Sequence, residues 1–138
     1  MTLQRILLNN LYCKLVYDIN GRKILKENSN YEKCYCCING RTTHIICKVE
    51  NSPHYEYIKG NKENYINYML NAGEYAGYGL EHGFDIFNKL IKEFSISKMG
   101  IIKCILVDNK YIIEDGVHRT SILLNLCHQF AWVDIKIK

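Results

Sequence analysis

The chain has 138 residues, of which 48% are hydrophobic and 23% are charged, a composition typical of a folded globular domain. This length is enough for one domain with its own core, and no apolar run approaches the roughly 20 residues that a membrane-spanning helix needs. The first residues lack the long apolar stretch of a signal peptide, so we expect a cytoplasmic protein with no membrane partner. The net charge of +4 is spread over scattered Lys and Arg residues, which suits a small anionic ligand and argues against nucleic acid as a partner.

The first third of the chain has the pattern of two β-hairpins. In each, two segments rich in apolar and aromatic residues flank an Asn-Gly pair, first Asn20-Gly21 and then Asn39-Gly40. Asn and Gly tolerate the positive φ angles of a type I′ turn, so this dipeptide is the strongest short hairpin signal. The expected strands are residues 11–17 with 22–25, and residues 31–38 with 42–49.

The middle of the chain changes from strand to helix character. Pro53 favours an extended or turn conformation at Ser52 and ends the strand pattern. Tyr65, Tyr68 and Met69 lie at helical spacing, which predicts a helix over residues 62–70. Residues 73–83 contain several glycines and predict a loop, and a loop of this length is often functional, for example as a lid.

The second half has clearer patterns. A stripe of apolar residues predicts an amphipathic helix over residues 84–94, and Gly100 restarts the chain as a strand. Asp108-Asn109 predicts a tight turn, and Trp132 is expected in the core. The remaining expected elements are strands at residues 101–107 and 111–113, a helix at 117–126 and a closing strand at 130–137.

Seven cysteines raise the question of a metal or disulfide site. Cys34, Cys36 and Cys37 stand close together, with Cys47 further along, whereas structural zinc sites usually use pairs of the form Cys-x(2–4)-Cys. In an extended strand Cys34 and Cys36 share one face and Cys37 points to the other. We therefore expect small buried core residues, with zinc as the less favoured alternative. The odd count argues against a disulfide framework.

The main candidate site lies where the strand at residues 111–113 passes into the following helix. Gly116 lets the backbone turn tightly and approach a ligand. The first turn of the helix offers unpaired N–H groups and a positive dipole end, an arrangement that binds phosphate. His118 and Arg119 add hydrogen-bond donors, and the hydroxyls of Thr120 and Ser121 offer a further contact.

Two acidic residues and a histidine complete this candidate site. Glu114 and Asp115 precede the turn and are the catalytic candidates, because a carboxylate there could hold Mg²⁺ or take a proton. His54 follows Pro53 on a polar segment and is a candidate for substrate or phosphate binding, with a hydrogen-bonded surface histidine as its alternative. The alternative for the turn is an ordinary helix start, in which Asp115 caps the helix and the first turn faces solvent.

The segment Asp115-Gly116-Val117-His118-Arg119, between an apolar strand and an apolar helix, resembles the ParB/sulfiredoxin-like superfamily. It is closer to the free-serine-kinase-like members, which read Asp-Gly-His-His-Arg, than to true sulfiredoxins, which read Gly-Cys-His-Arg. Val117 stands where sulfiredoxins have their nucleophilic cysteine, so reduction of sulfinic acids is not expected. Within a single domain, residues 84–138 would form the nucleotide-binding core and residues 1–50 a hairpin-rich extension.

The resemblance implies an α+β domain with a mixed sheet, preceded by β-hairpins, that binds ATP or ADP (with CTP as an alternative) and Mg²⁺. It implies that Gly116 forms the phosphate turn, that His118, Arg119 and Thr120 contact phosphate, and that Asp115 is the acidic residue of the kinase-like members. We expect a nucleotide-dependent phosphotransferase, a small-molecule kinase with a small polar acceptor, and a homodimer is compatible with this. The alternatives are a non-catalytic or slowly hydrolysing nucleotide-binding protein and a domain without a nucleotide site. DNA is not an expected partner, because the sequence has no helix-turn-helix domain.

Overall fold

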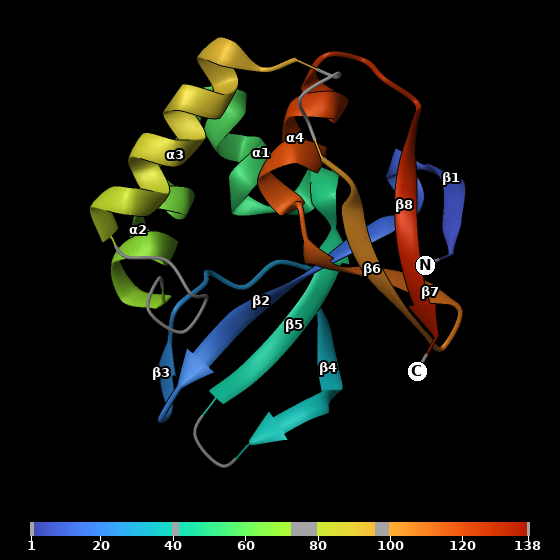
Figure 1. Cartoon of the computed structure of the whole chain (residues 1–138). Coiled ribbons are helices and arrows are strands. Elements are labelled where there is room, and N and C mark those ends of the chain that lie inside the picture. Colours follow the sequence, from blue (N-terminus) through green and yellow to red (C-terminus); the bar gives the residue numbers. More distant parts are fainter. Residues whose placement is uncertain (1, 40–41, 73–79, 96–99, 138) are drawn as a thin grey trace.

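The computed structural model describes residues 2–39, 42–72, 80–95 and 100–137. Within these ranges the chain forms one mixed sheet of eight strands, with four α-helices gathered on one side of it (Figure 1). The strands are β1 (Leu3–Leu7), β2 (Leu11–Ile19), β3 (Arg22–Lys23), β4 (Glu32–Asn39), β5 (Thr42–Lys48), β6 (Ile102–Val107), β7 (Lys110–Asp115) and β8 (Phe130–Ile137). The helices are α1 (Pro53–Ile58), α2 (Glu63–Ala72), α3 (Leu80–Glu93) and α4 (Val117–Asn125), with short 3-10 helices η1 (Leu8–Asn10) and η2 (Val49–Asn51). The fold class is therefore α+β.

The sheet joins the two halves of the chain. Its strand order is β1-β8-β6-β7-β2-β5-β4, and β3 pairs with β2. β2 lies parallel to β7, with Cys13 opposite Ile113, and β6 lies parallel to β8, whereas the other pairs are antiparallel. The hairpins of the first 50 residues thus form one side of the same sheet that carries β6, β7 and β8.

The predicted hairpin turns agree with the backbone angles. Asn20 and Gly21 have φ angles of 54° and 85°, and Asp108 and Asn109 have φ angles of 49° and 63°, as a type I′ turn requires. β4 and β5 pair antiparallel as expected, and residues 40–41 of the turn between them lie outside the described residues. The dipeptides predicted these turns because only a few residue types readily adopt positive φ angles.

Two helices differ from the prediction. α1 begins at Pro53, where Ser52 caps it by accepting a hydrogen bond from Tyr55 N at 3.2 Å, so the proline starts a helix at its favoured first position. α3 begins at Leu80, so the prediction of a loop up to residue 83 was wrong for its last four residues. The apolar spacing of the sequence continues back from Phe84 by one turn to Leu80, and one internal glycine costs a helix only about 1 kcal/mol. Residues 73–79 of the expected loop lie outside the described residues.

The β1–β8 side of the sheet holds a second departure. β1 was not predicted, and it forms an edge strand paired with β8. On β8, Ala131, Val133 and Ile135 are buried, whereas Trp132 is 59% exposed, so the expectation that Trp132 lies in the core was wrong. Alternating residues of a strand point to opposite faces, and Trp132 lies on the face away from its buried neighbours.

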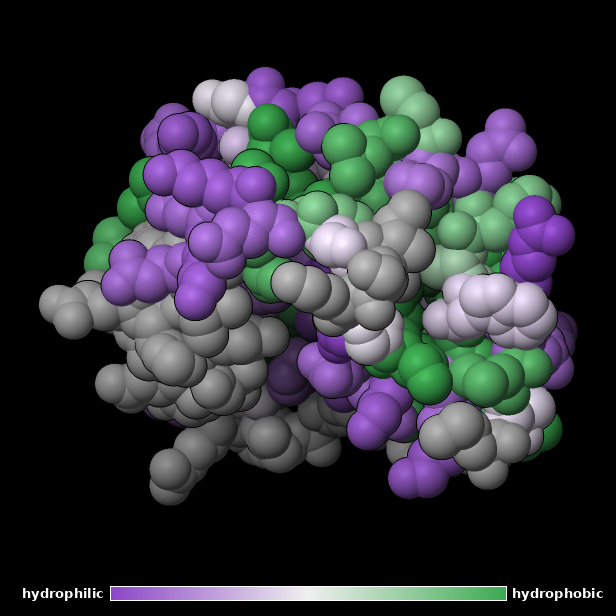
Figure 2. Space-filling view, turned by 45° about the horizontal axis from the view of Figure 1, so that its top comes forward, coloured by the Kyte–Doolittle hydropathy of each residue, from purple (hydrophilic) through white to green (hydrophobic). Residues whose placement is uncertain are grey.

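The core lies between the sheet and the helices. It includes the fully buried side chains of Leu11, Ile102 and Val133 from the sheet and of Tyr65 and Phe87 from the helices. On the described part of the face in Figure 2, hydrophilic residues are interspersed with apolar ones. No helix among the described residues has the length and apolar character needed to cross a membrane.

Candidate functional site

The turn between β7 and α4 is built on glycine. Gly116 has φ 120° and ψ 18° and lies at the N-cap of α4, with no side-chain cap hydrogen bond. A Cβ atom at this position would lie 3.2 Å from Ile102 Cγ1 and 3.3 Å from Arg119 Nη2. Glycine is therefore required both by the backbone angle and by the close approach of two side chains. Asp115 does not cap the helix, because Gly116 occupies the N-cap position.

The guanidinium of Arg119 lies in a corner between this turn and Gly100. Its Nη2 is 3.1 Å from Asp115 Oδ2, and the side chains of Arg119 and Asp115 are 20% and 63% exposed. Its Nη1 would be 3.0 Å from a Cβ atom at Gly100. A carboxylate engages at most two of the five guanidinium N–H donors, so Arg119 retains donors for an oxyanion. Together with the positive end of α4, the corner has the electrostatics of an anion site.

His118 lies on the other side of the same helical turn, among aromatic rings. Its Nε2 is 3.0 Å from the hydroxyl of Tyr65, and its ring centroid is 4.6 Å from those of His54 and Phe87. Burial, and then the positive charge of Arg119, lower the pKa of His118 from 6.5 to about 4. His118 is therefore uncharged at neutral pH, and it would offer an anion a hydrogen bond without a positive charge.

His54 meets His118 from α1. It is 4% exposed, and its Nδ1 is buried with no hydrogen-bond partner among the described residues. Burial, and then the nearby His118, hold the pKa of His54 well below its usual value. The structure thus brings His54 beside the predicted site, but in the buried layer behind it, and the surface-histidine alternative was wrong.

The hydroxyls of Thr120 and Ser121 turn back into the helix. Thr120 Oγ1 donates to the carbonyl of Gly116 at 2.8 Å, and Ser121 Oγ donates to the carbonyl of Val117 at 2.9 Å. Both residues are fully buried. Thr120 therefore stiffens the glycine turn from inside, and a direct phosphate contact by its hydroxyl remains a prediction that this geometry does not favour.

Glu114 and Asp115 lie in different surroundings. The β6–β7 pairing has an irregularity at this point, where Lys103 is opposite Asp115 but Cys104 is opposite Ile113. Asp115 pairs with Arg119, whereas Glu114 lines a cavity of about 420 Å³. The other described residues lining this cavity are Thr2, Lys103, Cys104, Asp134, Ile135 and Lys136. Of the two predicted catalytic carboxylates, the structure brings only Asp115 to the Arg119 corner.

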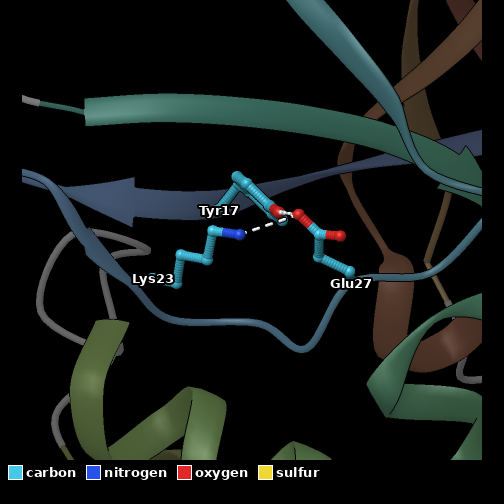
Figure 3. Close-up of polar contacts among 3 residues, drawn as sticks. All are labelled: Tyr17, Lys23 and Glu27. Atoms are coloured by element: carbon cyan, nitrogen blue, oxygen red, sulfur yellow. Dashed lines mark hydrogen bonds and ion pairs between the residues drawn. The ribbon is translucent and has the colours of Figure 1, made fainter.

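A second cavity of about 420 Å³ lies in the hairpin half, lined by Tyr17, Glu27, Asn28, Ser29, Tyr31, Lys33 and Ile45. Beside it, Glu27 Oε1 accepts hydrogen bonds from Lys23 Nζ at 2.7 Å and from the Tyr17 hydroxyl at 3.2 Å (Figure 3). These contacts hold the pKa of the Glu27 carboxyl below its usual value, with Lys23 as the largest cause. None of the described residues of the Arg119 corner lines this cavity.

The cysteines do not form one cluster in the described residues. Cys34 is buried in a small group with Ile46 and Ile112, as expected for a core residue. Cys47 lies opposite Cys13 of β2, with the two Sγ atoms 3.6 Å apart. The side chains of Cys36 and Cys37 lie outside the described residues. No group of three or more His, Cys, Asp or Glu among the described residues is arranged to hold a metal ion.

Sequence reasoning missed Tyr65, Phe87 and Gly100 as parts of this site. Tyr65 and Phe87 each belong to the apolar stripe of a predicted helix. Such a stripe indicates that a side chain is packed, but it does not identify the residue it packs against, here His118. The sequence predicts only that Gly100 begins a strand, and its closeness to Arg119 depends on how β6 and β7 pair. No protein-family model matches the chain, and no curated protein or solved structure matches it at a significant level. The resemblance to the ParB/sulfiredoxin-like superfamily therefore stays a proposal, carried by residues 115–119.

Proposed function

We propose that the chain is a nucleotide-dependent phosphotransferase, similar in kind to the kinase-like members of the ParB/sulfiredoxin-like superfamily. The turn from Asp115 to Arg119 would bind the phosphates of ATP or ADP, with CTP as the alternative, and the phosphoryl group would pass to a hydroxyl of a small polar molecule. Phosphoryl transfer depends mainly on positioning and charge neutralisation. The glycine turn, the start of α4 and the guanidinium of Arg119 are suited to both tasks.

Three side chains have different roles in this proposal. Arg119 supplies the positive charge and a planar set of donors for phosphate oxygens. His118, which is neutral at pH 7, supplies a hydrogen bond. Mg²⁺ bound with a nucleotide typically uses one or two carboxylates besides phosphate oxygens, and the exposed carboxylate of Asp115 fits this role or that of a proton acceptor. Bound Mg²⁺ would neutralise phosphate charge. Glu114 has no part in the proposed site.

The observation that carries the proposal is the place of Arg119. An ion pair with a carboxylate that is 63% exposed stabilises a fold by about 1 kcal/mol or less, so stability does not account for it. The guanidinium is held between Gly100 and Gly116, at both of which any side chain would crowd it. Its position beside the first turn of α4 adds a fixed side-chain charge to the partial charge of the helix start.

Calorimetric titration of ATP, ADP and CTP with Mg²⁺ tests the phosphate turn. We expect the wild type to bind at least one nucleotide, and Arg119→Ala to weaken binding by roughly one hundredfold, the effect of losing a charge-assisted contact. Arg22→Ala is the matched control, because Arg22 lies on β3 and bonds Asn71, so it should bind like the wild type. A wild type that binds no nucleotide, or equal losses in both variants, would overturn the proposal.

A second candidate is a nucleotide-binding protein that hydrolyses its ligand slowly or not at all. The position of Glu114 favours this candidate, because Glu114 lines a different cavity. Of the two predicted catalytic carboxylates, only Asp115 then lies at the Arg119 corner, and it is already paired with Arg119. The two candidates differ in their response to an acceptor. ADP release and ³¹P spectra with serine or simple sugars would reveal a phosphorylated acceptor in the first case, and a slow rate that no acceptor changes in the second.

A further inference from the structure

The hydroxyl of Tyr65 and the ring of His118 form a buried polar contact between α2 and α4. The oxygen of Tyr65 is 3.0 Å from Nε2 of His118, and Tyr65 is fully buried. The two rings are nearly perpendicular, with an interplanar angle of 86°, so the contact runs through the hydroxyl and does not involve stacking. A hydrogen bond at this site determines which nitrogen of His118 carries the proton.

The chemistry of the two groups sets the direction of this hydrogen bond. The pKa of His118 is lowered to about 4 by burial, so its ring is neutral at pH 7 and has one donor and one acceptor nitrogen. A phenol is a stronger acid than a neutral imidazole N–H, and an imidazole nitrogen is a better acceptor than a phenol oxygen. Tyr65 is therefore expected to donate to Nε2, which places the proton of His118 on Nδ1.

Neighbouring rings hold the His118 ring in place. His54 and Phe87 contact it edge-on at 4.6 Å, with interplanar angles of 80° and 83°. Phe87 is fully buried and His54 is 4% exposed. Together with Tyr65, these rings come from three helices, α1, α2 and α3, so rotation of the His118 ring would disturb the packing of each of them.

We propose that Tyr65 is a positioning residue for the anion site, which holds His118 in the form protonated at Nδ1, the ring nitrogen nearer the backbone of the first turn of α4. His118 then provides an N–H donor at that turn in addition to Arg119. The tautomer of His118 can be determined in the protein without any ligand, whereas its effect on phosphate binding rests on the proposed function. This division allows the two to be tested separately.

The first test uses ¹⁵N spectra of the imidazole nitrogens at pH 7. In the wild type we expect His118 to have a protonated Nδ1 and an unprotonated Nε2, and in Tyr65→Phe a mixture of tautomers. The ring and its packing are kept by this substitution, so folding should persist. Tyr57→Phe is the matched control, because Tyr57 belongs to the same ring cluster but donates to Asn88 Oδ1 at 2.7 Å, and it should leave the His118 signals unchanged. A protonated Nε2 in the wild type would overturn the proposal without any variant.

The second test measures the affinity for ATP with Mg²⁺ in the same proteins. Loss of one hydrogen-bond donor that is aligned for phosphate should weaken binding by roughly tenfold in Tyr65→Phe, with no change in Tyr57→Phe. Equal affinity in the wild type and Tyr65→Phe, with loss in Arg119→Ala, would overturn the role of Tyr65 and leave the phosphate turn standing. Absence of nucleotide binding by the wild type would instead overturn the proposed function, while the spectra would still decide the tautomer.

Discussion

His118 and Arg119 are neighbours in the first turn of α4, but their surroundings differ. The ring of His118 packs against His54, Tyr65 and Phe87 and is uncharged at neutral pH. The guanidinium of Arg119 lies beside two glycines and an exposed carboxylate. Successive side chains of a helix point about 100° apart, so one turn faces both the core and the surface. A single helix start thus combines a buried, neutral ring with a partly exposed positive charge.

The two sides of this turn should respond differently to substitution. On the His118 side the contacts are buried rings, so changes there act first on the free energy of unfolding. On the Arg119 side the contacts are ionic and partly exposed, so changes there act first on ligand affinity. The affinity of Arg119→Ala for nucleotides tests the Arg119 side, and three further substitutions test how the turn contributes to stability, described from the largest expected effect to the smallest.

Phe87→Ala should be the most destabilising of them. Phe87 is fully buried and contacts Tyr57, Tyr65 and His118, so its removal leaves a cavity and should cost about 3–5 kcal/mol of unfolding free energy. Urea denaturation measures this loss. Phe130→Ala is the control, because Phe130 is 38% exposed and should lose much less. Similar losses for both would mean that the ring cluster is not the tightly packed side of the turn.

Gly116→Ala should destabilise the fold by about 2–3 kcal/mol, from backbone strain at positive φ together with crowding. Gly60→Ala is a matched control, since Gly60 has φ 102° but an added Cβ would meet nothing within 4 Å. The control should lose about 1 kcal/mol, the cost of the backbone angle alone. The difference between their thermal or urea unfolding curves isolates the contacts with Ile102 and Arg119. Equal losses would show that these contacts can relax.

The free energy of unfolding should decrease as the pH is lowered from about 6.5 to 4, because His118 resists protonation in the folded protein. Its pKa in the folded protein is about 4 against 6.5 for the model value, so the unfolded chain takes up the proton first as the pH drops. The stabilisation is complete above pH 6.5 and is lost as the pH approaches 4. The full shift is equivalent to about 3 kcal/mol, and about 2 kcal/mol is expected because part of the residue remains accessible.

His118→Gln removes this titration, so its unfolding free energy should change less between pH 7 and pH 4.5 than that of the wild type. His54 adds a loss in the same direction, because burial also lowers its pKa. Denaturation curves at the two pH values measure the difference. Parallel losses in the wild type and His118→Gln would mean that His118 is already protonated, or freely solvated, near neutral pH.

The parts of the fold that the sequence predicted well are those governed by local geometry. Asn20-Gly21 and Asp108-Asn109 form the expected turns, because few residue types tolerate two successive positive φ angles. The alternation over residues 130–137 gave the bounds of β8, and the glycine before α4 gave the turn of the candidate site. In each case the pattern and the structure it predicts lie within a few residues of each other.

Long-range pairing decided the rest. The parallel contact of β2 with β7 made the hairpins part of the central sheet, and the pairing of β1 with β8 created an edge strand that its own sequence did not indicate. The same packing brought Gly100 to Arg119 and Tyr65 to His118, and it placed Glu114 at a cavity that Asp134, Ile135 and Lys136 of β8 also line. These contacts depend on which surfaces the whole chain buries together, and that free energy is shared among many residues distant in sequence. The residues of the turn were therefore readable from the sequence, whereas the charge and proton position of His118 depend on the three helices packed around it.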